Sequence, residues 1–133
     1  MITKSKFIIL QHKAKKAGLH YDLRFKIPDS KDWDSFALRK GTPKGNEKVL
    51  AVRTTIHSEK EALFTGEIKL GYGAGTLSKD DYGLCDILKY EPGNHIKIRF
   101  NGSKLKGIYH FINMKKIGRG TENQYLFFKG KLP

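Results

Sequence analysis

Cysteine is nearly absent from the sequence: Cys85 is the only one among 133 residues, so no disulfide can form within the chain. The chain also lacks an apolar run long enough to span a bilayer, and Met1 does not open a leader of charged, apolar and small-residue segments. These absences exclude a disulfide-stapled secreted domain and a membrane-spanning protein, and they predict a cytoplasmic location. Cys85 stands among the apolar neighbours of residues 83–87, which is typical of a buried structural thiol.

Acidic residues are scarce as well. The chain has 13 Asp and Glu against 26 Lys and Arg, a formal net charge of +13. So large a charge repels itself unless a polyanion offsets it, and nucleic acid is the first candidate partner because Lys and Arg release counterions from phosphates. A Lys-rich genome is the alternative explanation, and no amphipathic basic helix points to a membrane surface. At this length we expect a single domain covering residues 1–133.

Helical periodicity is also nearly absent, and two-residue alternation takes its place. From Leu19 to Ile27 apolar and polar residues alternate, which places them on opposite faces of one strand. An apolar run at residues 7–10 is typical of a strand that is buried on both faces. The expected strands are residues 7–10, 19–27, 35–39, 49–56, 95–101, 108–114 and 125–129. Turn signals lie at residues 28–30, 41–43, 79–81, 91–94, 101–102 and 118–120.

Many short strands at this spacing indicate an antiparallel barrel or sandwich, and closure favours the barrel because it removes exposed strand edges. The predicted fold is therefore mainly β, a small closed antiparallel β-barrel with little helix. One short helix is expected at residues 58–64, where Ser58 would be the N-cap and Glu61 would complete a capping box. A hairpin is expected at Asn101-Gly102.

The stretch from His12 to Arg24 carries the residues most suited to chemistry. On a strand, His20, Asp22 and Arg24 project from one face at alternate positions, and His12 joins them if its strand pairs with theirs. Imidazole and carboxylate ligands suit manganese, iron or zinc, and a metal so held would polarise a phosphate and lower the pKa of a bound water. The guanidinium of Arg24 suits a phosphate oxygen. The competing interpretation is a solvated polar face on which His20 and Asp22 bond to each other.

Two further features are candidates for the same site. His57 follows an expected strand and would donate a proton to a leaving oxygen or bind a phosphate, although an isolated histidine is more often a surface residue. The glycine-rich stretch at residues 71–75 lacks the Lys-Ser/Thr pair of a phosphate-binding P-loop, so it predicts only a tight turn close to the substrate. His95 and His110 lie on later strands and are interpreted as ordinary polar residues.

Several blocks of the chain, taken in order, carry a family resemblance. They begin with Phe7-Ile-Ile-Leu-Gln-His12, Leu19-His-Tyr-Asp-Leu-Arg24 and Ser35-Phe-Ala-Leu-Arg-Lys-Gly41. They continue with Leu50-Ala-Val, His57, Phe64-x-Gly66-x-Ile68, Gly71-Tyr-Gly-Ala-Gly75, Lys104-Leu-Lys-Gly-x-Tyr-His110 and Tyr125-Leu-Phe-Phe-Lys129. In this order, over nearly the whole chain, they resemble the 3′-phosphoesterase domain of bacterial DNA ligase D.

The resemblance implies a small β-barrel and a manganese-dependent phosphodiesterase and phosphomonoesterase. Members of that family remove a 3′-terminal ribonucleoside and then the remaining 3′-phosphate, which leaves a 3′-hydroxyl for DNA repair and end joining. The implied metal is Mn²⁺, with Zn²⁺ or Co²⁺ as alternatives. The implied partners are DNA or RNA 3′ ends together with separate ligase and polymerase proteins. Matched residue by residue, the metal ligands are His12, His20 and Asp22, and the catalytic residues are Arg24, Lys40 and His57. Further auxiliary candidates are Gln11, Glu61 and Tyr72.

The chain departs from the family's pattern in four ways. The connection between His12 and His20 is longer, Thr55 stands where a Glu precedes the third histidine, and Glu61 stands where a Tyr follows it. Only six residues precede Phe7, so the upstream basic and acidic site residues have no counterpart. These departures predict a reduced enzyme that still hydrolyses phosphomonoesters or diesters, with an altered preference among 3′ ends.

Two other functions stay open on the sequence. A catalytically weakened basic β-barrel would bind DNA ends or a repair partner without turnover. Two histidines and a carboxylate also match the ligand set of non-haem iron oxygenases, although Arg24 and the positive charge offer nothing to a small neutral substrate. End binding without metal-dependent hydrolysis would favour the first, and dependence on iron and a 2-oxoacid would favour the second.

Overall fold

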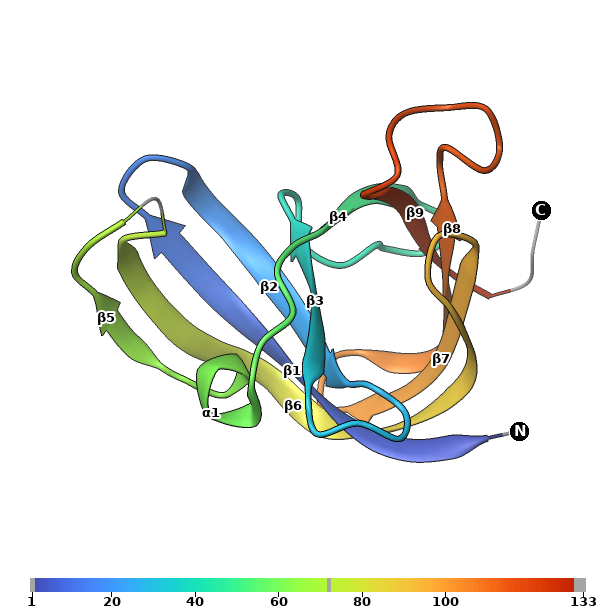
Figure 1. Cartoon of the computed structure of the whole chain (residues 1–133), viewed down its shortest axis with the longest axis horizontal. Coiled ribbons are helices and arrows are strands. Elements are labelled where there is room, and N and C mark those ends of the chain that lie inside the picture. The colour runs from blue at the N-terminus through green and yellow to red at the C-terminus, as the bar shows by residue number, and fades with distance from the viewer. Residues whose placement is uncertain (1, 72, 131–133) are drawn as a thin grey trace.

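A computed structural model of the chain describes residues 2–71 and 73–130. It is built mainly of strands, and each of the seven expected strands is present (Figure 1). In chain order the elements are β1 (Thr3–Ala14), β2 (Gly18–Lys26), β3 (Trp33–Leu38), β4 (Lys48–Arg53), α1 (Glu59–Ala62), β5 (Gly66–Ile68), β6 (Gly75–Glu91), β7 (His95–Gly102), β8 (Lys106–Asn113) and β9 (Gln124–Lys129). The prediction of a mainly β chain with little helix is confirmed.

The strands close into an antiparallel barrel. Within the described residues eight of them pair in the order β1-β2-β3-β4-β9-β8-β7-β6. The ring closes because β6 also pairs with the whole length of β1, from Thr3↔Ile87 to Ala14↔Gly75. The short β5 pairs with the start of β6 and lies outside the closed ring. The predicted closed barrel is therefore confirmed, and closure pairs both edges of β1.

Aromatic side chains fill the inside of the barrel. They come from alternate positions of the strands, so Leu23 and Phe25 of β2 point inward while Asp22 and Arg24 point outward. The rings of Phe36, Phe111 and Phe127 pack in succession, with centroids 4.5 Å and 4.3 Å apart. Burying each such ring contributes about 1.5–3 kcal/mol to the free energy of unfolding, so this interior is what holds the strands in register.

A second, smaller apolar cluster lies on the outer side of the wall. It is made of Ile8 and Leu10 of β1 together with Trp33, Ala62 and Leu77. Ala62 belongs to α1, whose N-cap is Ser58 and whose capping box with Glu61 is present, as predicted. This cluster buries the outer face of β1, which confirms that residues 7–10 form a strand covered on both sides.

The longest strand was not expected. The sequence predicts a turn at residues 79–81, and this prediction is wrong, because β6 continues through them to Glu91. The two aspartates mark a β-bulge instead: Ile9 pairs with Asp81 and Leu10 with Lys79, so Asp80 is the extra residue. The strand expected at residues 49–56 also ends earlier, at Arg53, and β5 was missed because it is only three residues long.

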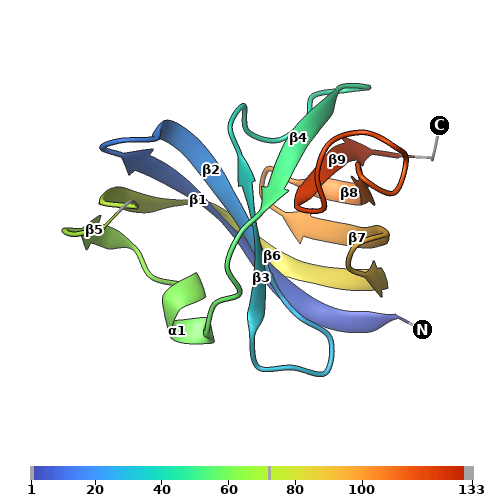
Figure 2. The same cartoon turned by 45° about the horizontal axis from the view of Figure 1, so that its top comes forward.

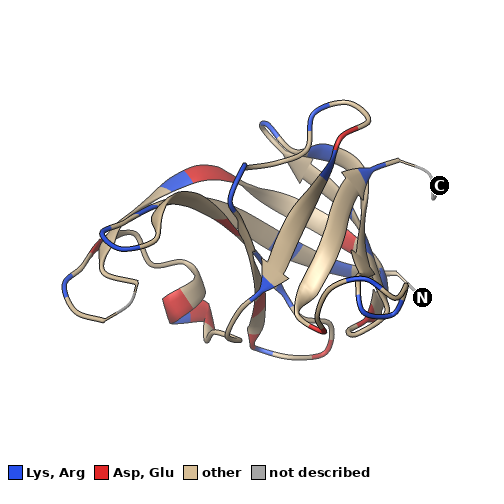
Figure 3. Ribbon diagram, turned by 90° about the horizontal axis from the view of Figure 1, so that it is seen from above, with Lys and Arg blue, Asp and Glu red and all other residues tan. Residues whose placement is uncertain are grey.

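The strands β1, β2 and β6 run beyond the closed ring on one side, where α1 and β5 lie next to them (Figures 1 and 2). Lys and Arg occur along the chain at both ends of the barrel (Figure 3). Cys85 is buried, as predicted, and burial raises the pKa of its thiol to about 12. In the described part of the chain no helix has the length and apolar character needed to cross a membrane.

Candidate metal centre

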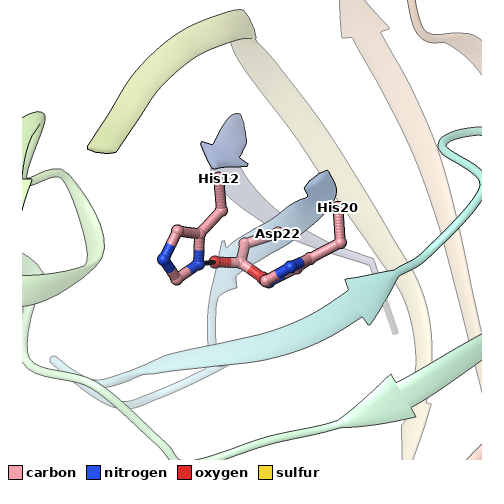
Figure 4. A group of neighbouring side chains, drawn as sticks. All are labelled: His12, His20 and Asp22. Atoms are coloured by element: carbon pink, nitrogen blue, oxygen red, sulfur yellow. Dashed lines mark ion pairs between the residues drawn. The ribbon is translucent and has the colours of Figure 1, made fainter. Parts of the chain in front are cut away.

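Pairing of β1 with β2 brings His12, His20 and Asp22 together. His12 stands directly opposite His20 in the register, and Asp22 follows two residues later on the same face of β2. One ligand atom from each residue lies within 4.8 Å of the other two, and Figure 4 shows the three side chains pointing toward one another. The structure thus groups the three predicted metal ligands on the outer face of the barrel wall, opposite the buried Leu23.

His12 carries the clearest sign that a cation belongs here. Its Nε2 lies 2.8 Å from the carbonyl oxygen of Gly73, which can only accept, so Nε2 is the donor and a neutral His12 presents a lone pair on Nδ1. Nδ1 is 3.4 Å from Oδ2 of Asp22, and it is buried without a hydrogen-bond partner among the described residues. Two acceptors facing each other are unfavourable, and a divalent cation would satisfy both. The residues present therefore fit a metal.

Asp22 supplies the negative charge of the centre. Burial alone would raise its pKa, but the contact with His20 and the charge of Arg24 hold the pKa of Asp22 below its ordinary value. The Asp22 carboxylate in turn raises the pKa of His20, whose Nε2 lies 3.2 Å from Oδ1. An ionised carboxylate between two imidazoles can hold manganese, iron or zinc, and metal binding would displace any proton on His20.

Arg24 directs most of its guanidinium at the protein. Nη2 donates to Oδ2 of Asp22 at 3.3 Å, and Nε donates to Oγ of Ser35 at 3.2 Å. Nη1 donates to the carbonyl oxygens of Glu61 and Ala62 at 3.2 Å and 3.1 Å. A guanidinium has five N–H groups, so one N–H on Nη2 is left for a ligand. Arg24 therefore joins the end of α1 to the metal centre and can offer a phosphate a single hydrogen bond.

His57 is held beside this arrangement by its backbone. Its N–H donates to the Trp33 carbonyl at 3.0 Å, and its own carbonyl accepts from the Trp33 N–H at 2.8 Å. Burial, and then the charge of Arg24, lower the pKa of His57, so its imidazole is neutral at neutral pH. His57 and Arg24 line one pocket, so Arg24, which contacts Asp22, lies between the predicted third histidine and the metal centre.

The remaining predicted residues are less directly connected to the metal centre. Lys40 is exposed in the turn after β3. Gln11 points to the opposite face from His12, where its Nε2 donates to Oη of Tyr21 at 3.5 Å. The Glu61 carboxylate accepts from the N–H and Oγ of Ser58, so it serves the capping box. Tyr72 lies outside the described residues.

Arg39 is a neighbour of the site that the sequence analysis missed. It lines a pocket with His20, and its positive charge opposes the rise in the pKa of His20. The alternation could have found it, since Ala37 stands opposite Asp22 and Arg39 follows on the same face of the sheet. His95 and His110 are elsewhere, on β7 and β8, where their imidazoles hydrogen-bond to each other at 2.8 Å.

Comparison with known protein families gave a match. The family described as the DNA ligase D 3′-phosphoesterase domain matches residues 10–113, which includes His12, His20, Asp22, Arg24 and His57. No curated protein sequence matches the chain significantly.

Proposed function

This chain belongs to the family of DNA ligase D 3′-phosphoesterase domains, and we propose on that basis that it is a metal-dependent phosphoesterase that restores 3′-hydroxyl ends in DNA repair. The observation that carries the proposal is the buried Nδ1 of His12, which has no hydrogen-bond partner among the described residues and lies 3.4 Å from Oδ2 of Asp22. A cation would satisfy both acceptors, and a cation beside the guanidinium of Arg24 suits binding of a phosphate ester.

The proposed metal ligands are His12, His20 and Asp22, and the proposed metal is Mn²⁺, with Zn²⁺ or Co²⁺ as alternatives. When bound, a divalent cation polarises a phosphate oxygen and makes a water ligand more acidic. Two imidazoles with one carboxylate leave a net positive charge on such a centre, which favours an anionic substrate. The formal net charge of +13 favours the same class of substrate, since it draws a nucleic acid to the protein.

The chain's own groups would orient the terminal phosphate. The free N–H of Arg24 Nη2 would bind a nonbridging oxygen next to Asp22. Neutral His57 would direct its ring N–H at the leaving oxygen, a contact that supports cleavage of either a phosphomonoester or a phosphodiester. Lys40 would contribute positive charge from the turn after β3.

A second function is favoured by a specific observation. Arg24 has one free N–H, and the Glu61 carboxylate is committed to the helix cap, so few groups near the metal centre are free to act on a substrate. A barrel with these limits would bind a nucleic-acid 3′ end without turning it over.

The two functions are separated by incubating metal-free protein with a primer–template that carries a 3′-phosphate, with and without Mn²⁺. We expect Mn²⁺-dependent conversion to a 3′-hydroxyl, and we expect His20→Ala and Asp22→Asn to lower turnover about 100-fold or more. A 3′-ribonucleotide end, tested in parallel, measures whether both activities are present.

Asp86→Asn is the matched control, because Asp86 pairs with Arg99 at the surface and its loss should leave turnover unchanged. If folded protein loaded with Mn²⁺ binds the primer end but does not convert it, the chain is a binding module and the proposal of an enzyme is wrong.

A further inference from the structure

A pocket of about 500 Å³ opens next to the metal centre, between α1, the segment after it, and the strands β5 and β6. Its accessible surface is mostly apolar. The apolar side is formed by Phe64, Ile68 and Leu77, and the smaller polar side by Arg24, His57, Lys60 and Glu61. None of the roles assigned above to the metal centre uses the apolar side.

The pocket is held at a fixed place relative to the metal centre. Arg24 lines it and lies 3.3 Å from Asp22, while its Nη1 holds the last carbonyls of α1. A phosphate bound to Arg24 beside Asp22 would therefore place its next substituent at the mouth of the pocket. In a nucleic acid 3′ end, that substituent is a nucleoside.

Charge on the polar side matches such a ligand. Arg24 and Lys60 are cations, His57 is neutral at neutral pH, and the Glu61 carboxylate is turned to the N–H and hydroxyl of Ser58. The polar rim is therefore suited to an anion, whereas the apolar wall is suited to an uncharged group. A nucleotide combines the two.

Phe64 presents a flat aromatic surface in this pocket. Its side chain is 44% exposed, whereas the chain's other phenylalanines are all buried. The ring lies against Gly66, where a Cβ would be 3.4 Å from Cζ, an ordinary van der Waals contact. An exposed ring beside cationic side chains is how single-stranded nucleic acids are bound by stacking.

We propose that this pocket receives the base of the 3′-terminal nucleotide, with the base stacked on Phe64 and covered by Ile68 and Leu77. The inference rests on the proposed function in placing the terminal phosphate beside Asp22 and Arg24. The apolar wall offers no hydrogen bonds to a base edge, so the pocket accepts all four bases and prefers a nucleotide to an abasic end.

The test uses a single strand with a 3′-phosphate and 2-aminopurine as its last base, titrated with the full chain in Mn²⁺. Stacking quenches the fluorescence of 2-aminopurine. We expect quenching with the unaltered protein, loss of quenching and about tenfold weaker binding with Phe64→Ala, and recovery with Phe64→Trp. Ile117→Ala is the control, since Ile117 is similarly exposed, at 47%, and does not line the pocket.

A second readout uses hydrolysis. For a 3′-phosphate on an abasic terminal sugar, Phe64→Ala should leave KM and kcat unchanged, while for a normal nucleotide end it should raise KM about tenfold. Equal changes on the two ends would mean that Phe64 only supports the fold, and would overturn the inference.

The two proposals fail separately. Quenching that depends on Phe64, without any hydrolysis, would contradict the proposed enzyme activity and support the base pocket. Hydrolysis with no quenching, or with quenching that is unchanged in Phe64→Ala, would overturn the base pocket and support the enzyme activity. Recovery by Phe64→Trp excludes misfolding as the reason for a loss.

Discussion

Arg24 illustrates how one side chain can belong both to the site and to the fold. Four of its N–H groups go to Asp22, Ser35 and two carbonyls of α1, over chain separations of up to 38 residues. Burial lowers the pKa of Arg24, but a guanidinium stays charged, so these bonds persist across the physiological pH range. A residue that sequence analysis assigns to the phosphate is thus also the tie between α1 and the metal centre.

Arg24→Lys should therefore weaken the fold as well as the activity. A lysine ammonium cannot reach Ser35, Asp22 and the α1 carbonyls at once, so we expect a loss of about 2–4 kcal/mol in the free energy of unfolding. Urea denaturation followed by circular dichroism measures it, with Arg39→Lys at the exposed neighbouring position as control. An unchanged midpoint for Arg24→Lys would show that α1 does not depend on this guanidinium.

At the scale of the element, the β7–β8 hairpin depends on a carboxylate from another strand. Asp81 of β6 is 4% exposed and accepts four backbone N–H groups. Three of them come from the turn at residues 103–105, and the fourth is that of Tyr82. Burial would raise the pKa of Asp81, but these hydrogen bonds hold it below its ordinary value of 3.8. The aspartate that looked like a turn signal instead organises a turn 22 residues away.

We expect Asp81→Asn to lower the free energy of unfolding by about 2–4 kcal/mol, because the amide nitrogen would face backbone donors. Since the folded-state pKa is depressed, the carboxylate stabilises the fold fully above pH 3.8 and loses this effect as the pH falls through the folded-state pKa. The difference between the two proteins should therefore shrink in acid. Asp80→Asn, which breaks a surface pair with Lys104, should change stability little at any pH. If the difference in the free energy of unfolding between the unaltered protein and Asp81→Asn stayed constant into strong acid, the stabilisation would come from packing rather than from the carboxylate charge.

For the whole molecule, the candidate metal centre lies where three strands leave the closed ring, so metal binding there would be coupled to folding. The ligands come from β1 and β2, while the carbonyl that holds His12 precedes β6, and the unfolded chain has none of this arrangement. A ligand that binds only the folded state stabilises it by mass action.

Mn²⁺ at about 100 times its dissociation constant should add about 2.7 kcal/mol to stability and raise Tm by about 10 °C. Differential scanning calorimetry of metal-free protein with and without Mn²⁺ measures the shift, and Asp22→Asn should abolish it. A shift of equal size in Asp22→Asn would place the binding site elsewhere.

Much of this protein can be predicted from its sequence because neighbouring residues encode it directly. Alternation from Leu19 to Ile27 assigns each side chain to a face of β2, and Ser58 with Glu61 specifies the start of α1. The grouping of His20, Asp22 and Arg24 on one face follows from the two-residue period of a strand. Pairing across a short connection then brings in His12.

Other features were decided only by the tertiary structure, because they join segments far apart in the chain. The tautomer of His12 depends on Gly73, 61 residues away, and the donors of Arg24 depend on where α1 packs. The length of β6 was hidden because its two aspartates form a bulge opposite β1, a role that only strand pairing reveals. Local pattern thus determined which residues face the metal centre, while closure of the barrel decided how they are held there and that an aromatic pocket lies beside them.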